Sequence, residues 1–572
     1  MKKIFSTLLI GLSLFSIAGC SDSDYADKYT DPSKTTTVGV PQVFTGVMFK
    51  ANTWMNPVYY RYYTQSSTSG IFSGVIGDYN TRGRFRGASE GYFNNRWKNF
   101  YDMVTQFRVL EETYNNLSDK EKDVNTVFVH LSRTLVYSQL HEILSLFGDA
   151  PFNGAGTLWK SDYSTAQSKC VYDDDVVLYK QILSDLKETG DFLSGSINPT
   201  GVASLGLQDY STAAGSTTIW RKYVNSLRLR IALHLATNGD CTSEAQAAIK
   251  EILENPTQYP LIDSNAENMG VKGDTQTDNF NFGKSMSQAL RTGNFAAGSN
   301  AVLKAMNVPA GGIPNADTDP RLAAMYDCNP DGEYIAPDIS MSNSEITNLA
   351  SEKNQEYVQR GITQANYFCE VDTQAVAGYA SYEGNANLDG LWLGAAEVSL
   401  SKAEAYLMGY GVAKDEAKAK ECFIQGVKQS CEYYWDMKKG SSLYKKGNDS
   451  YNGFRALVEP TDAEIDAYAE KIWQPTQEAV CTQLWLNFGY MNELEAWNVV
   501  RRTGFPVITF ARDQQISNYP TPPNRLPYPS DELSFNKTNC QNAIQLNYEE
   551  STGYYTNLFW AKKDYYQLIS GN

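Results

Sequence analysis

Apolar residues recur every three or four positions over several long stretches of this chain. In one stretch they are Trp97, Phe100, Val104, Phe107 and Leu110, which share one face of a helix. A helix with one apolar face is stabilised by packing that face against another element. The periodicity therefore predicts a mainly α fold in which helices pack in pairs, with minor β structure.

A second helix follows the first after a short loop. Ser118 and Glu121 have the spacing of a capping box, and Gly148 ends the apolar pattern. Helices joined by a short loop pack antiparallel, so these two form a hairpin. Similar patterns predict helices at about 174–189 and 220–236.

The clearest pair of helices lies at 395–437. The first reads AAEVSLSKAEAYLMGYG and ends at Gly409 and Gly411, and the second reads AKDEAKAKECFIQGVKQSCEYYW. Ala403 and Ala405 are small enough to let the two helices approach closely. This pattern is typical of a tetratricopeptide-like hairpin, although no strict 34-residue period runs through the chain.

The chain begins with a secretory signal that closes on a cysteine. Two lysines precede an apolar run over residues 4–17, and Ala18, Gly19 and Cys20 complete a cleavage site. A cysteine at this point is typical of a bacterial lipobox, in which the thiol is acylated before cleavage. The apolar run is shorter than the roughly 20 residues that span a bilayer. We therefore expect a signal peptide over 1–19 and a protein held to a membrane by lipid on Cys20.

The residues after the signal divide into a linker and a folded part. Residues 21–40 are polar with few large apolar side chains, which predicts a flexible tether. We therefore expect residues 20–40 to be the lipidated cysteine with its tether, and residues 41–572 to form a single helical domain.

The mature chain is acidic. The whole sequence has a formal charge of −16, and removal of the two lysines of the signal gives −18. An acidic chain repels nucleic acid, which excludes nucleic acid as a partner. The eight cysteines beyond Cys20 are widely spread without a CxxC pair, so the sequence leaves their disulfide pairing open.

Tyrosine is unusually frequent, with 38 tyrosines against 24 phenylalanines. Its ring suits surfaces that are apolar on one side and wet on the other, as in a sugar-binding site. Aromatic residues concentrate in residues 54–96, among Asp, Asn and Arg side chains that can bind hydroxyls or carboxylates. A smaller group lies in the segment DNFNFG. The candidate ligand-binding residues are Trp54, Tyr62, Asp78, Tyr79, Asn80, Arg82, Arg84, Phe85, Phe280 and Phe282. The alternative is a solvated loop with tyrosines packed beneath it.

Several polar segments predict long loops. They are rich in Asn, Gly, Ser, Asp or Pro and lie at 261–300, 310–320, 328–345, 438–455 and 511–530. Long loops on a rigid helical frame are where binding sites form.

No residue has the context of a catalytic group. The chain has only three histidines, and it lacks GxxxxGK[ST], HExxH and GxSxG motifs in a suitable setting. A glycoside hydrolase needs two carboxyl groups about 5–10 Å apart, and no motif of the sequence places such a pair. A secreted hydrolase is therefore the less favoured alternative. The run Asp173-Asp174-Asp175 favours helix capping over Ca²⁺ binding, because no D-x-D-x-D-G loop surrounds it. We expect no metal and no cofactor, with Ca²⁺ as the weak alternative.

Several segments, in order along the chain, resemble the SusD/RagB family of nutrient-binding outer-membrane lipoproteins. After the lipobox come FGDAPF, YDDDVVLYKQILSDL, the basic and aromatic helix WRKYVNSLRLRIALHLA, DPRLAAMYD, the tetratricopeptide-like hairpin, and ELEAWNVVRRTGFP leading to RLPYPSDELSFN. In ELEAWNVVRRTGFP, Arg501 and Arg502 follow Glu495 by one to two turns, which predicts ion pairs along the helix. The spacing resembles the second SusD-like subgroup, so no site residue of the founding starch binder is transferred.

The resemblance implies a scaffold of four tetratricopeptide-like hairpins with a loop-rich binding face. It implies a non-catalytic protein, anchored by lipid on the exterior of the outer membrane, that captures a glycan or oligosaccharide. It also implies a TonB-dependent, SusC-like β-barrel transporter as the partner that receives the ligand. A peptide ligand and a helical scaffold that binds only a protein partner are the alternatives.

Overall fold

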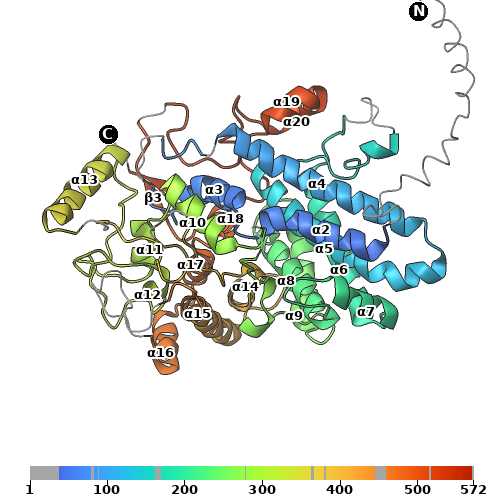
Figure 1. Ribbon diagram of the computed structural model, residues 1–572, viewed down its shortest axis with the longest axis horizontal. Coiled ribbons are helices and arrows are strands. Elements are labelled where there is room, and N and C mark those ends of the chain that lie inside the picture. Colours follow the sequence, from blue (N-terminus) through green and yellow to red (C-terminus); the bar gives the residue numbers. More distant parts are fainter. Residues whose placement is uncertain are drawn as a thin grey trace, which may run out of the picture.

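The computed structural model describes residues 38–78, 83–87, 89–161, 169–276, 279–362, 366–378, 380, 382–444, 459–514 and 517–569. Within them the fold is mainly helical, which confirms the prediction from the periodicity (Figure 1). The helices are α2 (Val40–Met55), α3 (Tyr59–Gln65), η1 (Ser66–Gly70), α4 (Glu90–Asn115), α5 (Asp119–Phe147), η2 (Leu158–Ser161), α6 (Asp175–Ser194), α7 (Pro199–Gln208), α8 (Thr217–Leu235), α9 (Thr242–Glu254), η3 (Asn265–Glu267), α10 (Phe282–Gly293), α11 (Asn300–Ala305), α12 (Leu322–Met325), α13 (Asn343–Gln359), α14 (Ala395–Met408), α15 (Glu416–Lys439), α16 (Asp462–Ile472), α17 (Gln477–Phe488), α18 (Glu493–Thr503), α19 (Ser530–Phe535) and α20 (Lys537–Asn547).

The strands are few and short. They are β1 (Met269–Val271), β2 (Gly390–Leu393), β3 (Thr509–Phe510) and β4 (Gln567–Leu568). β1 pairs antiparallel with β2, with a shift of register between Met269 and Gly270, and β3 pairs in parallel with β4. The strands connect distant parts of the chain rather than forming a layer of their own.

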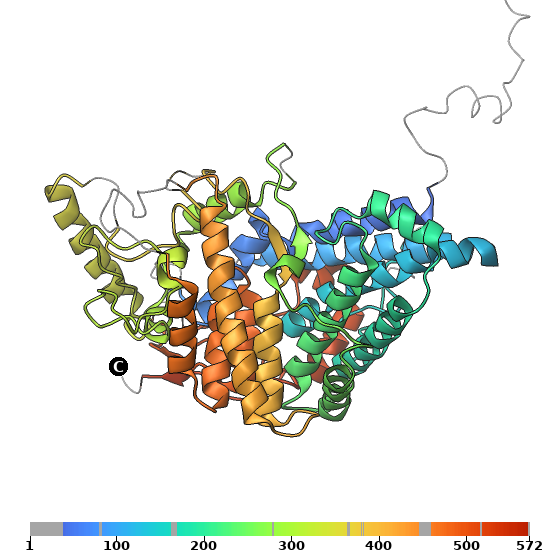
Figure 2. The same ribbon diagram turned by 90° about the horizontal axis from the view of Figure 1, so that it is seen from below.

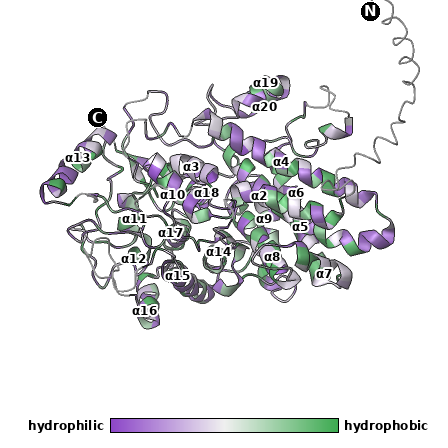
Figure 3. Cartoon of the chain, in the orientation of Figure 1, coloured by the Kyte–Doolittle hydropathy of each residue, from purple (hydrophilic) through white to green (hydrophobic). Residues whose placement is uncertain are grey.

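The N-terminal helices pack as the sequence predicts. α2, α4 and α5 contact one another and lie toward one end of the molecule, with α13 at the other (Figure 1). The side chain of Glu121 accepts hydrogen bonds from the backbone N–H and hydroxyl of Ser118, at 2.9 and 2.6 Å, at the start of α5. Figure 3 shows apolar and polar residues interspersed along α4, and most of the apolar ones are buried. The predicted hairpin is therefore confirmed.

The tetratricopeptide-like hairpin is also present. α14 packs against both α15 and α17, and the helices of residues 395–503 stand side by side in orange tones in Figure 2. α14 ends at Gly409, whose left-handed backbone (φ +77°) favours glycine. Where α15 crosses α14, a Cβ on Gly426 would lie 2.6 Å from Cγ of Leu400. Glycine at this position therefore lets the two backbones approach closely.

A single large hydrophobic cluster extends from Val40 to Tyr565. Among its largest fully buried side chains are four tryptophans: Trp220, Trp485, Trp497 and Trp560. None of the eight cysteines beyond Cys20, all of which lie in the described ranges, forms a disulfide. Of the helices in those ranges, none combines the length and the apolar character needed to cross a bilayer.

The structure corrects one predicted loop. Residues 261–300 contain strand β1 and helix α10, and Asn281 caps α10 by accepting a 3.2 Å hydrogen bond from the backbone N–H of Lys284. Phe282, Met286 and Leu290 form the buried face of α10. The many polar residues of this segment occupy caps and outer faces, which is why composition alone indicated a loop.

Arg501 and Arg502 do not form the ion pairs predicted along α18. The guanidinium of Arg501 lies over the ring of Trp497, 3.6 Å from its centroid, and Arg502 pairs with Glu404 on α14. The prediction was wrong because α18 is buried on all sides, so its arginines find partners on neighbouring elements.

Candidate functional site

Helix α3 presents its tyrosines on two different faces. Its sequence is YYRYYTQ, and it runs directly into the π-helical turn η1, a feature often found at functional sites. Arg61 and Tyr62 point into the core and are 3 % and 1 % exposed. Tyr60, one position earlier, is 52 % exposed.

The outward tyrosines of α3 meet Tyr92 at the start of α4. The rings of Tyr63 and Tyr92 stack with centroids 4.8 Å apart. Tyr59 lies 5.7 Å from Tyr63, and Tyr60 lies 6.0 Å from Tyr92. We call Tyr59, Tyr60, Tyr63 and Tyr92 the tyrosine patch. Phe295, just after α10, supports it edge-on at 5.3 Å from Tyr63.

A cavity of about 190 Å³ opens beside the tyrosine patch. Its lining includes Tyr63 and Tyr92, the hydroxyl-bearing Ser67 of η1, and the charged residues Asp78 and Arg86. The Arg86 side chain is exposed. Burial, and then the hydrogen bond with Tyr59, raises the pKa of Tyr92, so this phenol stays neutral and can exchange hydrogen bonds with a ligand. Aromatic rings beside neutral and charged polar groups are suited to binding a sugar.

Four of the predicted ligand-binding side chains lie in the core instead. Trp54, Tyr62, Phe85 and Phe282 are at most 2 % exposed. Trp54 lies beneath the guanidinium of Arg96, 5.0 Å from its ring centroid. Large aromatic side chains gain most by burial, and these four are closed to a ligand in this structure.

Three other predicted residues have mixed environments. Arg84 is buried and donates hydrogen bonds to the carbonyls of Ile339 and Met341, at 2.8 and 3.0 Å. It therefore holds loops together instead of facing a ligand. Asp78 is 1 % exposed but lines the cavity beside the patch. Phe280 is partly buried, with its ring 5.4 Å from that of Tyr210. Tyr79, Asn80, Arg82 and Cys20 lie outside the described residues.

The tyrosine patch and the predicted ligand-binding residues share a segment of the chain but not the same tyrosines. The patch lies inside residues 54–96, yet none of its four tyrosines was among the candidates. A helix over 59–65 places Tyr59 and Tyr63 on one face, four positions apart, and turns Tyr62 away from it. Recognising that short helix would have found the outward face.

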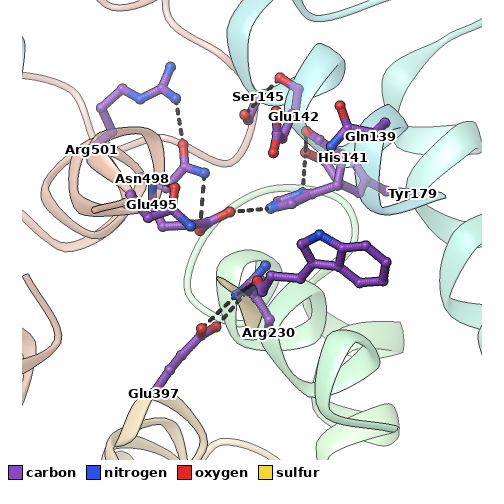
Figure 4. Close-up of polar contacts among 12 residues, drawn as sticks. Gln139, His141, Glu142, Ser145, Tyr179, Arg230, Glu397, Glu495, Asn498 and Arg501 are labelled. Atoms are coloured by element: carbon purple, nitrogen blue, oxygen red, sulfur yellow. Dashed lines mark hydrogen bonds and ion pairs between the residues drawn. The ribbon is translucent and has the colours of Figure 1, made fainter. Parts of the chain in front are cut away.

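A network of buried charges lies deeper in the molecule and joins α5, α8, α14 and α18 (Figure 4). Arg230 donates hydrogen bonds to both carboxylate oxygens of Glu397, at 2.5 and 2.6 Å. His141 lies 3.3 Å from the carboxylate of Glu495. Asn498 donates to Glu495 at 3.3 Å and accepts from Arg501 at 2.6 Å.

This network is built to hold helices together. Burial alone would raise the pKa of Glu495, but hydrogen bonding and charge from His141, together with Arg230, outweigh it and lower the pKa to about 2. Glu495 is therefore a fixed anion. The cavity beside Arg230 and Glu397 measures only about 30 Å³, about the space of one water molecule. It is too small for a sugar.

The run of three aspartates acts as a helix start. Asp174 accepts a 3.0 Å hydrogen bond from the backbone N–H of Val177, which confirms the predicted cap of α6. Within the ranges that the structure describes, no three His, Cys, Asp or Glu side chains gather as metal ligands would.

A larger cleft, of about 1070 Å³, lies between α11, α16 and α17. The two tyrosines among its lining residues, Tyr334 and Tyr468, are at most 5 % exposed. The cleft therefore offers no exposed aromatic ring, and the tyrosine patch is the better candidate for a sugar.

Comparison with known proteins covers almost the whole fold. Residues 44–529 match the second SusD-like family, described as starch-binding and associating with the outer membrane. No curated protein matches the chain. A solved chitin-binding protein is 18 % identical with a TM-score of 0.67, over 90 % of this chain and 99 % of its own.

Two further solved structures show the same fold. A chitin-binding SusD homologue from Flavobacterium johnsoniae is 16 % identical with a TM-score of 0.61, over 91 % of this chain and 98 % of its own. A SusD homologue from Bacteroides uniformis is 19 % identical with a TM-score of 0.60, over 91 % of this chain and 99 % of its own. The chain therefore belongs to the SusD-like family, whose description is starch-binding and associating with the outer membrane.

Proposed function

We propose that this protein is a cell-surface lipoprotein that captures a glycan at the tyrosine patch without cleaving it. The observation that carries the proposal is the tyrosine patch, in which the ring of Tyr60 is half exposed. The patch lies next to a cavity with polar and charged side chains. Family membership and two structurally similar chitin-binding proteins support a glycan as the ligand.

The chemistry of the patch fits reversible sugar binding. A pyranose ring has apolar C–H faces that pack on tyrosine rings, and its hydroxyls exchange hydrogen bonds with phenols and charged side chains. Binding of this kind needs no group with a tuned pKa. The cavity beside the buried carboxylate of Glu397 measures only about 30 Å³ and is too small for a sugar, which supports a binder over a hydrolase.

The patch is tested by replacing its exposed ring. Tyr60→Ala should weaken binding of a hexasaccharide about tenfold or more, in the range of one lost aromatic contact. Tyr114→Ala is the matched control. Tyr114 is a half-buried tyrosine on α4, the helix that carries Tyr92 of the patch, and lies about 33 Å beyond Tyr92 along the helix axis. Equal affinities of the wild type and Tyr60→Ala would reject the patch.

The panel of ligands decides the substrate class. It contains starch, cellulose and chitin hexasaccharides, an acidic hexagalacturonate and a peptide digest. Saturable binding of a glycan without new products supports the proposal. Binding of peptides alone would favour a peptide carrier, and product release would make the protein a hydrolase.

We further propose that lipid on Cys20 anchors the protein at the outer membrane, facing outward, beside a TonB-dependent SusC-like transporter. The lipobox of the sequence supports the lipid anchor, and the family description supports the outer membrane. The outward orientation and the transporter follow from the resemblance of the sequence to SusD/RagB lipoproteins. In Cys20→Ala cells the protein should leave the membrane fraction, and uptake of the bound glycan should fall. Full retention of the variant in washed membranes would reject the anchor.

A further inference from the structure

A second cavity, of about 370 Å³, lies where β1 and β2 meet the C-terminal end of α15. Its volume is within the range of about 300–1,000 Å³ that is typical of small-ligand sites. None of its lining residues lines the cavity beside the tyrosine patch. We call it the strand-pair pocket.

Three asparagines supply amide groups to the strand-pair pocket: Asn265, Asn268 and Asn387. Their positions are fixed by protein contacts. Asn387 donates a 2.9 Å hydrogen bond to the carbonyl of Gly440, and Asn265 donates one of 2.9 Å to the carbonyl of Gln429. Asn268 accepts a 2.8 Å hydrogen bond from the backbone N–H of Ala395.

These contacts leave part of two of the amides, those of Asn268 and Asn387, for a ligand. Within the described ranges, the Asn387 side-chain oxygen accepts no hydrogen bond, and the NH₂ group of Asn268 makes only a long, 3.4 Å contact with Asn265. An amide oxygen accepts and an amide NH₂ donates, so together they match a hydroxyl group, which does both.

Tyr433 provides the aromatic side of the strand-pair pocket. Burial raises the pKa of its phenol, and the nearby Asp389 raises it further, so the hydroxyl is neutral. Among the described residues this hydroxyl has no hydrogen-bond partner. The half-buried ring and the neighbouring Met437 also line the pocket, and they form an apolar surface for the C–H face of a sugar.

The charges around the strand-pair pocket disfavour an anionic ligand. Lys272 is neutralised by Asp389 at 2.6 Å, and the exposed Asp436 adds a further negative charge. Lys439 shares Asp436 at 3.0 Å, but it also pairs with Glu459 at 2.7 Å. A carboxylated or sulfated sugar would therefore find no uncompensated cation here.

We propose that the strand-pair pocket is a second saccharide site, which holds one neutral pyranose unit between the amides of Asn268 and Asn387 and the ring of Tyr433. The proposal rests on the glycan-binding function proposed above, and it adds a separate contact for the same class of ligand. Two sites on one protein raise the effective affinity for a long chain that reaches both, without any new contact.

Hydrogen exchange of the full mature chain locates the binding directly. The probes are maltohexaose, cellohexaose and chitohexaose, with hexagalacturonate as the acidic comparison. We expect a neutral probe to slow exchange in peptides that cover residues 265–272 and 386–391. Protection confined to residues 59–95 would overturn the second site and leave the proposed function intact.

The remaining outcomes are also decisive. Protection of the strand-pair pocket alone would support the second site and reject the tyrosine patch as the binding site. No protection with any probe would overturn both proposals. Protection of the pocket by hexagalacturonate would overturn its preference for neutral sugars.

Two substitutions test the assignment. Asn387→Ala and Tyr433→Phe each remove one ligand hydrogen bond, and each should weaken binding at the pocket by about three- to tenfold. The matched controls are Asn125→Ala on α5 and Tyr406→Phe on α14, neither of which lines the pocket. If all four variants bind alike, the pocket is not a saccharide site.

Discussion

Arg502 on α18 forms a two-pronged ion pair with Glu404 on α14, with N–O distances of 2.6 and 2.5 Å. Both side chains are almost fully buried, at 4 % and 0 % exposure. The pair fixes the position of α18 against the tetratricopeptide-like hairpin. It also replaces the ion pairs along α18 that the sequence suggested.

Removing one partner of this pair should be strongly destabilising. Glu404→Ala leaves a buried, uncompensated guanidinium and should lower the free energy of unfolding by about 3–5 kcal/mol. Lys250→Ala breaks an exposed pair with Glu254 and should change it by less than about 1 kcal/mol. Urea unfolding measures both. A similar small loss for both variants would contradict a stabilising role for the buried pair.

Two helical glycines should respond in opposite ways to alanine. A Cβ on Gly426 would lie 2.6 Å from Leu400, whereas one on Gly91 in α4 would meet nothing within 4 Å. Gly426→Ala should therefore destabilise the fold by about 1–3 kcal/mol. Gly91→Ala should stabilise it by up to about 1 kcal/mol through helix propensity. Thermal unfolding of the two variants compares them, and equal shifts would contradict the close contact of α14 and α15.

The tyrosines of α3 should separate stability from binding. Tyr62→Ala empties a core position and should cost about 3–5 kcal/mol of unfolding free energy, in the range of other large aromatic truncations. Tyr60→Ala changes a half-exposed side chain and should cost less than about 1 kcal/mol. Unfolding midpoints in urea test this contrast. A larger loss for Tyr60→Ala would mean that α3 is turned the other way.

Glu493 should make stability depend on pH. Burial raises the pKa of this carboxyl to about 8, although the hydroxyl of Ser66 and the charge of Arg61 oppose the shift. Between its ordinary value near 4.5 and about 8 the unfolded chain loses a proton that the folded protein keeps. Its contribution to stability is therefore full below about 4.5 and is lost as the pH rises to about 8.

Glu493→Gln removes this titration. Relative to the wild type, the variant should gain stability as the pH rises from 5 to 8.5, which urea unfolding at the two values measures. A constant difference between the variant and the wild type across this range would show that Glu493 has an ordinary pKa in the folded protein.

The sequence predicts helices well and side-chain directions less well. The apolar spacing of α4, α5, α14 and α15 is long enough to show which face is buried. α3 has only seven residues, and all of them are tyrosine or polar, so its pattern contains no apolar face to read. The partner of Arg502 is 98 positions away along the chain, and no local pattern indicates it.

The central claim is that the tyrosine patch binds a glycan without cleaving it. Calorimetric titration of the mature chain with the hexasaccharide panel, followed by analysis of the recovered sugar, tests it most directly. We predict saturable heat with a neutral glycan, an affinity about tenfold weaker in Tyr60→Ala, and recovery of the intact hexasaccharide. Unchanged binding in Tyr60→Ala, or recovery of shortened sugars, would contradict the account.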